Sequence, residues 1–252
     1  MAPVVAAESV ASVAIVFTVA GWVKGVTGMG LPTVAMGALG LVMAPVQAAA
    51  LLLVPSLVTN VCQFATGPHR EAIIRRLLPM MLCVCLGTGV GIGLLTSGSS
   101  RWPSVALGGV LAAYALLALF LPRLSVPATA ERLLSPVVGA ITGVLTGATG
   151  VFVVPAVPYL SALGFSKDEL VQALGLSFTV STVALGIAMG TAGSVQPAAL
   201  AASVATVAPA LLGMFVGQRI RNRIAPAKFR RWFFLAMLAV GLYMVARGLL
   251  AS

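Results

Sequence analysis

The stretch GVTGMGLP, residues 25–32, places three glycines and a proline between flanks that are almost wholly apolar. In a helix interior, glycine costs about 1 kcal/mol relative to alanine, and proline costs about 3 kcal/mol. A buried segment that keeps both residue types in so short a stretch predicts a helix that breaks here. What the break does depends on the sequence around it.

The composition is typical of an integral membrane protein. Hydrophobic residues make up 60% of the 252 positions, charged residues make up 8%, and the mean hydropathy is +1.10. Soluble domains carry about 25% charged residues, and a spanning helix needs about 20 apolar residues, a length that several runs here reach. The short polar connections leave no room for a separate soluble domain.

The net charge of +10 arises from basic residues in short loops between the apolar runs. Orientation in a lipid bilayer explains such a distribution without a nucleic-acid-binding surface. The sequence therefore predicts the lipid bilayer as a partner, and no nucleic acid.

Apolar runs and the breaks between them predict ten embedded segments, at about residues 4–24, 29–43, 45–65, 74–96, 103–121, 135–147, 150–164, 169–190, 197–216 and 231–250. The second, sixth and seventh have about 15 residues or fewer, which is short for a complete span. They resemble half-helices or re-entrant arms. The sequence leaves open whether they cross fully or re-enter.

Two stretches of the sequence repeat. GWVKGVTGMGLP from Gly21 matches GAITGVLTGATGVFVVP from Gly139, and QAAALLLVPS from Gln47 matches QALGLSFTVS from Gln172. A duplication with an offset of about 120 residues is the expected cause. We expect a first repeat over 1–122, a cytoplasmic linker over 123–134 and a second repeat over 135–252, together forming one transmembrane domain.

The distribution of charge predicts that the two repeats face opposite ways. The loop after the third segment carries His69, Arg70, Arg75 and Arg76, whereas its counterpart GTAGSVQP is uncharged. The next pair of loops reverses this, because SGSSRWP has only Arg101 and GQRIRNRIAPAKFRR is strongly basic. By the positive-inside rule, the predicted fold is an all-α membrane protein with two inverted-topology repeats of about five helical segments each and both termini outside.

Broken helices in inverted repeats commonly form a substrate site near the membrane midplane. A break frees backbone N–H groups, and a helix N-terminus carries roughly half a positive charge, so an anion is a suitable ligand. Alternatively, the glycines are helix-packing notches and Lys24 extends to the membrane interface. The predicted substrate-binding residues at the two breaks are Lys24, Thr27, Gly28, Met29, Gly30, Thr146, Gly147, Thr149 and Gly150.

Polar side chains also recur at helical spacing in the third and eighth segments. In lipid these groups need partners, so both stripes are expected to face the protein interior. Interhelical hydrogen bonding is the alternative to ligand binding. The stripes are Gln47, Ser56, Thr59, Asn60 and Gln63, and Gln172, Ser177, Thr179, Ser181 and Thr182. Of these, Gln47, Asn60, Gln172, Ser177 and Ser181 complete the predicted substrate-binding set.

The acidic residues favour an anionic substrate by their positions. Glu8 lies near the outer terminus, and Glu71, Glu131, Asp168 and Glu169 fall in basic or cytoplasmic loops. A cation carrier or a carboxylate proton relay would normally need an acid deep in the membrane.

No metal, other cofactor or catalytic residue is predicted. His69 lies in a basic loop, and Cys62, Cys83 and Cys85 fall in apolar runs without CxxC spacing or histidine partners. No convincing nucleophile–base pair is present, so the chain is not expected to be an enzyme.

The residues from Gly21 to Pro32, with the arrangement repeated from Gly139, resemble the sulfite exporter TauE/SafE family, also called the 4-toluene sulfonate uptake permease family. The shared pattern is GxxxGxxGxG, then a proline-containing apolar stretch and an alanine-rich helix. The chain departs from the usual glycine run, because Leu31 follows Gly30 and GATGVF replaces a GxGGG-like stretch. The resemblance implies a bacterial inner-membrane transporter of sulfite, sulfonates or related small anions.

We therefore expect a secondary carrier for a small anion. A passive anion channel is the near alternative, and a non-transporting membrane subunit or an intramembrane enzyme are further ones. The sequence leaves open the anion, the direction of transport, the coupling ion and the oligomeric state, a homodimer included.

Overall fold

The predicted break forms between two helices of unequal length. α1 (Ala7–Thr27) ends just before Gly28, and α2 (Leu31–Leu39) begins just after Gly30, with Pro32 in its first turn. Proline is well tolerated there because the first N–H groups of a helix have no partner within it. A residue type that would disrupt a helix interior thus helps to start the second helix.

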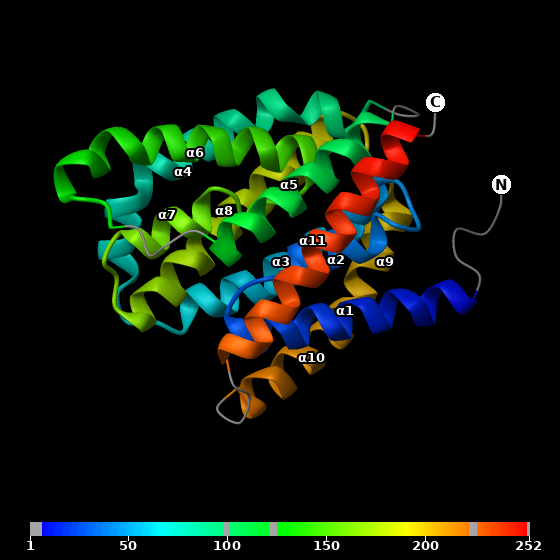
Figure 1. Cartoon of the computed structure of the whole chain (residues 1–252), viewed down its shortest axis with the longest axis horizontal. Helices are drawn as coiled ribbons and strands as arrows, with labels where there is room; N and C mark the ends of the chain where they lie inside the picture. The colour runs from blue at the N-terminus through cyan, green and yellow to red at the C-terminus, as the bar shows by residue number, and fades with distance from the viewer. Residues whose placement is uncertain (1–6, 98–100, 121–124, 222–225, 251–252) are drawn as a thin grey trace.

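The computed structural model describes residues 7–97, 101–120, 125–221 and 226–250. Within these ranges every regular element is a helix (Figure 1), which confirms the predicted all-α class. The elements after α2 are α3 (Pro45–Ala65), α4 (Arg70–Leu95), α5 (Trp102–Phe120), α6 (Ala128–Thr149), α7 (Ala156–Ala162), α8 (Lys167–Thr191), α9 (Pro197–Ala205), α10 (Val207–Ile220) and α11 (Pro226–Leu250).

Eight helical segments of the described chain are long and apolar enough to cross a membrane. They are α1, α3, α4, α5, α6, α8, α9 with α10, and α11. The remaining two, α2 and α7, have 9 and 7 residues. At about 1.5 Å per residue, neither alone can cross a hydrocarbon layer of about 30 Å.

One predicted segment is longer in the structure than the sequence suggests. The sixth was expected to be short, at 135–147, but α6 has 22 residues and begins at Ala128, inside the predicted linker. The stretch ATAERLL at its start is too polar to count as embedded, yet its residues mostly favour helix. Hydropathy indicates which residues are embedded in the membrane, but it does not indicate how far the helix extends beyond them. Val4 to Ala6 of the predicted first span and Arg123 of the linker lie outside the described residues.

Four helix pairs organise the molecule: α1 packs along α10, α4 along α6, α3 along α8, and α5 along α11. Figure 1 shows α4 and α6 along one edge of the molecule and α1 and α10 along the opposite edge, with α3 and α8 between them. A Cβ atom added at Gly21 or Gly25 would collide with α10 carbonyl oxygens, and one at Gly139 or Gly143 with those of α4. Glycine thus permits both close contacts, as in other membrane helix pairs.

Hydrogen bonds bring several helix ends together at one end of the bundle. Gln63 Nε2 donates to Gly28 O at 3.0 Å and to Val171 O at 2.9 Å, which ties the first break to the end of α3 and the start of α8. Arg76 of α4 donates to both Glu131 carboxylate oxygens, at 2.7 and 2.8 Å, and to Leu163 O at 3.0 Å. We call this end the basic end, because it carries His69, Arg70, Arg75, Arg76, Arg132, Lys167, Arg219 and Arg221.

Candidate functional site

The first break has a backbone that requires glycine. Gly28 has φ 81° and Gly30 has φ 104°, in the left-handed region that L side chains rarely adopt. Thr27 Oγ1 donates to Val23 O at 2.9 Å and accepts from Met29 N at 3.2 Å, so it satisfies groups freed by the end of α1.

The second break repeats this arrangement. Gly150 has φ 73°, Thr149 Oγ1 donates to Leu145 O at 2.7 Å, and Val151 N donates to Thr149 Oγ1 at 3.2 Å. The last turns also match, since Gly28 N donates to Lys24 O at 2.7 Å and Gly150 N donates to Thr146 O at 2.8 Å. By this geometry Thr149 corresponds to Thr27, and Thr146 corresponds to Lys24.

Lys24 is the basic residue nearest the first break, and its side chain points into the protein. It is 3% exposed, and Nζ donates to Thr59 Oγ1 at 3.1 Å and to Asn60 Oδ1. Asn60 Nδ2 in turn donates to Thr182 Oγ1 at 3.4 Å. We call these four residues the polar cluster; it joins α1, α3 and α8. The alternative that Lys24 extends to the membrane interface is therefore wrong.

The partners of Lys24 are neutral. Among the residues that the structure describes, no carboxylate lies within ion-pairing distance of its amino group. Burying an unpaired charge costs several kcal/mol, and neutral hydrogen-bond acceptors offset only part of that. A positive charge on Lys24 is thus left without a counter-charge from the described residues.

Further hydroxyl groups on the same two helices have no hydrogen-bond partner within the described chain. They belong to Ser56, Ser177 and Ser181, which are at most 1% exposed. Ser56 lies one turn before Asn60 on α3, and Ser181 adjoins Thr182 on α8. An unsatisfied buried hydroxyl costs about 1–3 kcal/mol, so these groups are available donors for a ligand or for water.

Two predicted amides lie apart from the polar cluster. Gln172 Nε2 donates to Phe64 O at 3.0 Å and to Gly67 O at 2.8 Å, and its Oε1 accepts from His69 N at 3.1 Å, so it caps the end of α3. Gln47 is exposed in the first turn of α3, at the opposite end of that helix from Asn60.

The predicted glycines divide into two kinds. A Cβ atom at Gly147 would collide with the Thr88 carbonyl oxygen, so Gly147 serves the contact between α6 and α4. A Cβ atom at Gly28 would meet only Val171 Cγ2, at 3.9 Å, which leaves open space around this backbone. Of the other predicted residues, Thr146 is buried and donates to Thr142 O at 2.7 Å, and half-buried Met29 accepts from Tyr114 Oη at 3.4 Å.

The prediction omitted two members of the cluster, Thr59 and Thr182, although both stood in the polar stripes. Their positions in the sequence could have indicated them, because Thr59 directly precedes Asn60 and Thr182 directly follows Ser181, and both neighbours belong to the predicted set. Spacing shows which face of a helix is polar, but it does not show which hydroxyl meets the buried lysine.

The cluster is closed to solvent in this conformation, with Lys24, Thr59, Asn60 and Thr182 at most 4% exposed. Cavities are found elsewhere. One of about 400 Å³ lies between α4 and α8, beside Cys85 and Thr179. Another, of about 350 Å³, lies between the turn after α2, the start of α5 and the end of α11.

Eight candidate spans around a buried polar interior define a multi-pass membrane protein. Within that class, the sequence model of the sulfite exporter TauE/SafE family matches residues 13–244, and the chain belongs to this family. It is a family of transporters and not of enzymes, which confirms the resemblance and the prediction that the chain is not an enzyme. No curated protein and no solved structure matches the chain.

Proposed function

We propose that the chain is a secondary transporter that moves a small sulfur-containing oxyanion, such as sulfite or an organosulfonate, by alternating access around the polar cluster. The observation that carries the proposal is Lys24, a buried lysine whose hydrogen-bond partners are a hydroxyl and an amide.

The chemistry of the cluster suits a sulfite or sulfonate group. Such a group offers several acceptor oxygens, and a lysine supplies a compact positive charge with three N–H donors. The unpartnered hydroxyls of Ser56, Ser177 and Ser181 add neutral donors on the adjacent helices. A hydrogen bond to an ionised group is roughly twice as strong as a neutral one, so the bound anion offsets the cost of the buried lysine.

The helix contacts support two inverted repeats. In this correspondence α1, α2, α3 and α5 match α6, α7, α8 and α11, and α4 matches α9 with α10. The α1–α10 contact then has its counterpart in the α6–α4 contact, and the central α3–α8 pair is its own counterpart. The matching hydrogen bonds of Thr27 and Thr149 follow the same correspondence. In this arrangement α2 and α7 are re-entrant half-helices, and the second repeat begins with α6 rather than at residue 135.

The distribution of charge supports an orientation in a bacterial inner membrane. The basic end faces the cytoplasm, and the start of α1 and the end of α11 lie on the outer side, because positively charged loops are retained inside. In transport, the glycine-packed pairs α1–α10 and α4–α6 move as rigid units and expose the cluster to one side and then the other. The homodimer stays a prediction.

Replacing the buried lysine tests the proposal. In proteoliposomes, the wild-type protein should take up radiolabelled sulfite or methanesulfonate, and Lys24→Met should lower the rate by about 100-fold or more, the scale for losing a buried charged partner. The matched control is Lys167→Met, which removes an exposed lysine at the start of α8. Uptake by a folded Lys24→Met protein at the wild-type rate would refute the site.

Counterflow separates a carrier from a passive channel. Vesicles preloaded with unlabelled anion should take up labelled anion faster than empty vesicles, because a loaded carrier returns through its occupied state. A channel shows no such acceleration.

A further inference from the structure

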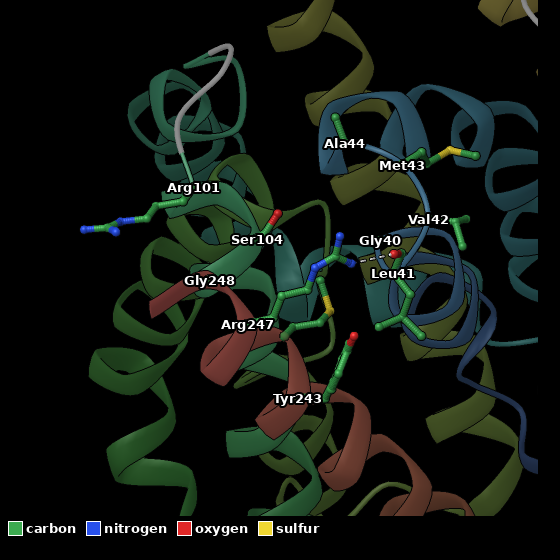
Figure 2. Close-up of a pocket in the computed structure, with 11 residues that line it drawn as sticks. Gly40, Leu41, Val42, Met43, Ala44, Arg101, Ser104, Tyr243, Arg247 and Gly248 are labelled. Carbon is green, nitrogen blue, oxygen red and sulfur yellow. Dashed lines mark hydrogen bonds between the residues drawn. The ribbon is translucent and has the colours of Figure 1, made fainter. Parts of the chain in front are cut away.

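A second cluster of donors lies at the end of the bundle opposite the basic end. A cavity of about 350 Å³ is bounded by the turn between α2 and α3, the start of α5 and the end of α11 (Figure 2). Its lining includes Leu41, Ala44, Ser104, Tyr243 and Arg247. Ala44 lies fifteen residues before Thr59, and at about 1.5 Å per residue of α3 the cavity is about 22 Å from the polar cluster.

Arg247 is the charged group aimed into this cavity. Its Nη1 donates to Leu41 O at 3.1 Å, and a guanidinium has five N–H donors in a planar fork. The remaining donors of Arg247 have no partner among the described residues, and no carboxylate lines the cavity. The guanidinium therefore keeps an unneutralised charge and open donor positions toward the cavity.

Two hydroxyl groups complete the set. Figure 2 shows the Ser104 and Tyr243 hydroxyls pointing toward the space beside the Arg247 guanidinium, while the Arg101 guanidinium points away. Arg101 lies instead over the Trp102 ring, 5.7 Å from its centroid. α3 and α5 begin beside the cavity, whereas α2 and α11 end there, so the partial charges of these helix ends offset one another and Arg247 carries the positive charge.

We propose that this cavity is a binding site for an oxyanion group, sulfonate, sulfate or phosphate, separate from the transport site. Arg247 holds two of its oxygens through the guanidinium fork, and the Ser104 and Tyr243 hydroxyls donate to the others. The group comes either from a free anion or from the headgroup of an anionic lipid, since both present the same oxygens at a membrane surface.

Binding of radiolabelled sulfate to the full-length protein in phosphatidylcholine nanodiscs tests the site. The Lys24→Met background removes the proposed transport site, so the remaining binding reports the cavity alone. Arg247→Gln should weaken sulfate binding by about tenfold or more in this background, as expected for a lost charge-assisted fork. Arg247→Lys should retain an intermediate affinity, and Arg219→Gln, an exposed arginine on α10, should leave it unchanged.

Phosphatidylglycerol in the nanodiscs distinguishes the two sources. A site that takes the lipid headgroup loses sulfate binding as phosphatidylglycerol is added, and one that takes the free anion does not; each result supports an oxyanion site. The proposal is overturned if neither the sulfate binding nor the phosphatidylglycerol association of monodisperse Lys24→Met protein depends on Arg247. Transport by Lys24→Met alone decides the proposed function, so the two can fail separately.

Discussion

Asn60 holds two members of the polar cluster at once, because its carbonyl oxygen accepts from Lys24 and its amide group donates to Thr182. The side chain is fully buried at 0% exposure. An amide can do both because it carries an acceptor and two donors without net charge. Because Asn60 is neutral, it does not compensate a positive charge on Lys24.

Asn60→Asp tests whether the uncompensated charge of Lys24 matters, because aspartate has nearly the same shape as asparagine. A carboxylate beside Lys24 would form an ion pair and repel an incoming anion, so uptake should fall by about tenfold or more while the Tm in detergent stays level or rises. The matched control is Gln196→Glu, an exposed amide outside the cluster. Normal anion uptake by Asn60→Asp would contradict a role for the uncompensated lysine.

At this scale the sequence predicts types of residue better than contacts. Lys24 and Asn60 both belong to the predicted set, because a lysine beside a helix break and an amide on an apolar helix each need a partner, and the structure joins them by a hydrogen bond. Gln172 met the same criterion, yet it caps the carbonyls at the end of α3. Those carbonyls are freed only where α3 ends, and a single sequence fixes that point poorly.

The close approach of α4 and α6 shows how glycines determine the packing of whole helices. Gly139, Gly143 and Gly147 lie along one face of α6, and each meets a carbonyl of α4. The sequence analysis placed Gly147 in the predicted substrate-binding set, with a packing notch as the alternative. The structure places it in the notch, and only the positive-φ glycines mark the breaks themselves.

Gly147→Ala should therefore affect folding more than transport chemistry. The added methyl group would meet the Thr88 carbonyl and force α6 away from α4, at a cost of about 1–3 kcal/mol. A lower Tm and a lower yield of monodisperse protein would report it. Gly89→Ala on α4 is the control, because its Cβ would meet nothing within 4 Å. Equal Tm values for the two variants would count against the notch.

At the scale of the whole molecule, hydropathy predicted most of the long helices, because each crossing needs an apolar run of similar length. It missed the full length of α6, whose first turns are polar, and the interruption at Thr206 that divides α9 from α10. The sequence alone does not predict which helices pair, because small residues on a helix permit a close contact but do not specify the partner helix.

Membrane-impermeant labelling tests the proposed orientation. In a protein whose native cysteines have been replaced, Lys167→Cys places a single thiol at the start of α8, and Gln196→Cys places one in the loop that follows the other end of α8. A maleimide should label the cysteine at 196 in right-side-out vesicles and the one at 167 only in inside-out vesicles. Labelling of both from one face would refute the assignment of α8 as a crossing and, with it, the proposed topology.

Thr146 occupies in the second break the place that Lys24 occupies in the first. If the two halves are inverted repeats, as proposed, they are chemically unequal, and the inward-open and outward-open forms of the proposed carrier are not energetic mirror images. An anion that enters from the cytoplasm and one that enters from outside would then pass different residues before they reach the buried Lys24 amine. Under the proposed carrier function, half-saturating concentrations for influx and efflux should therefore differ, which would give the protein a kinetic bias between export and uptake.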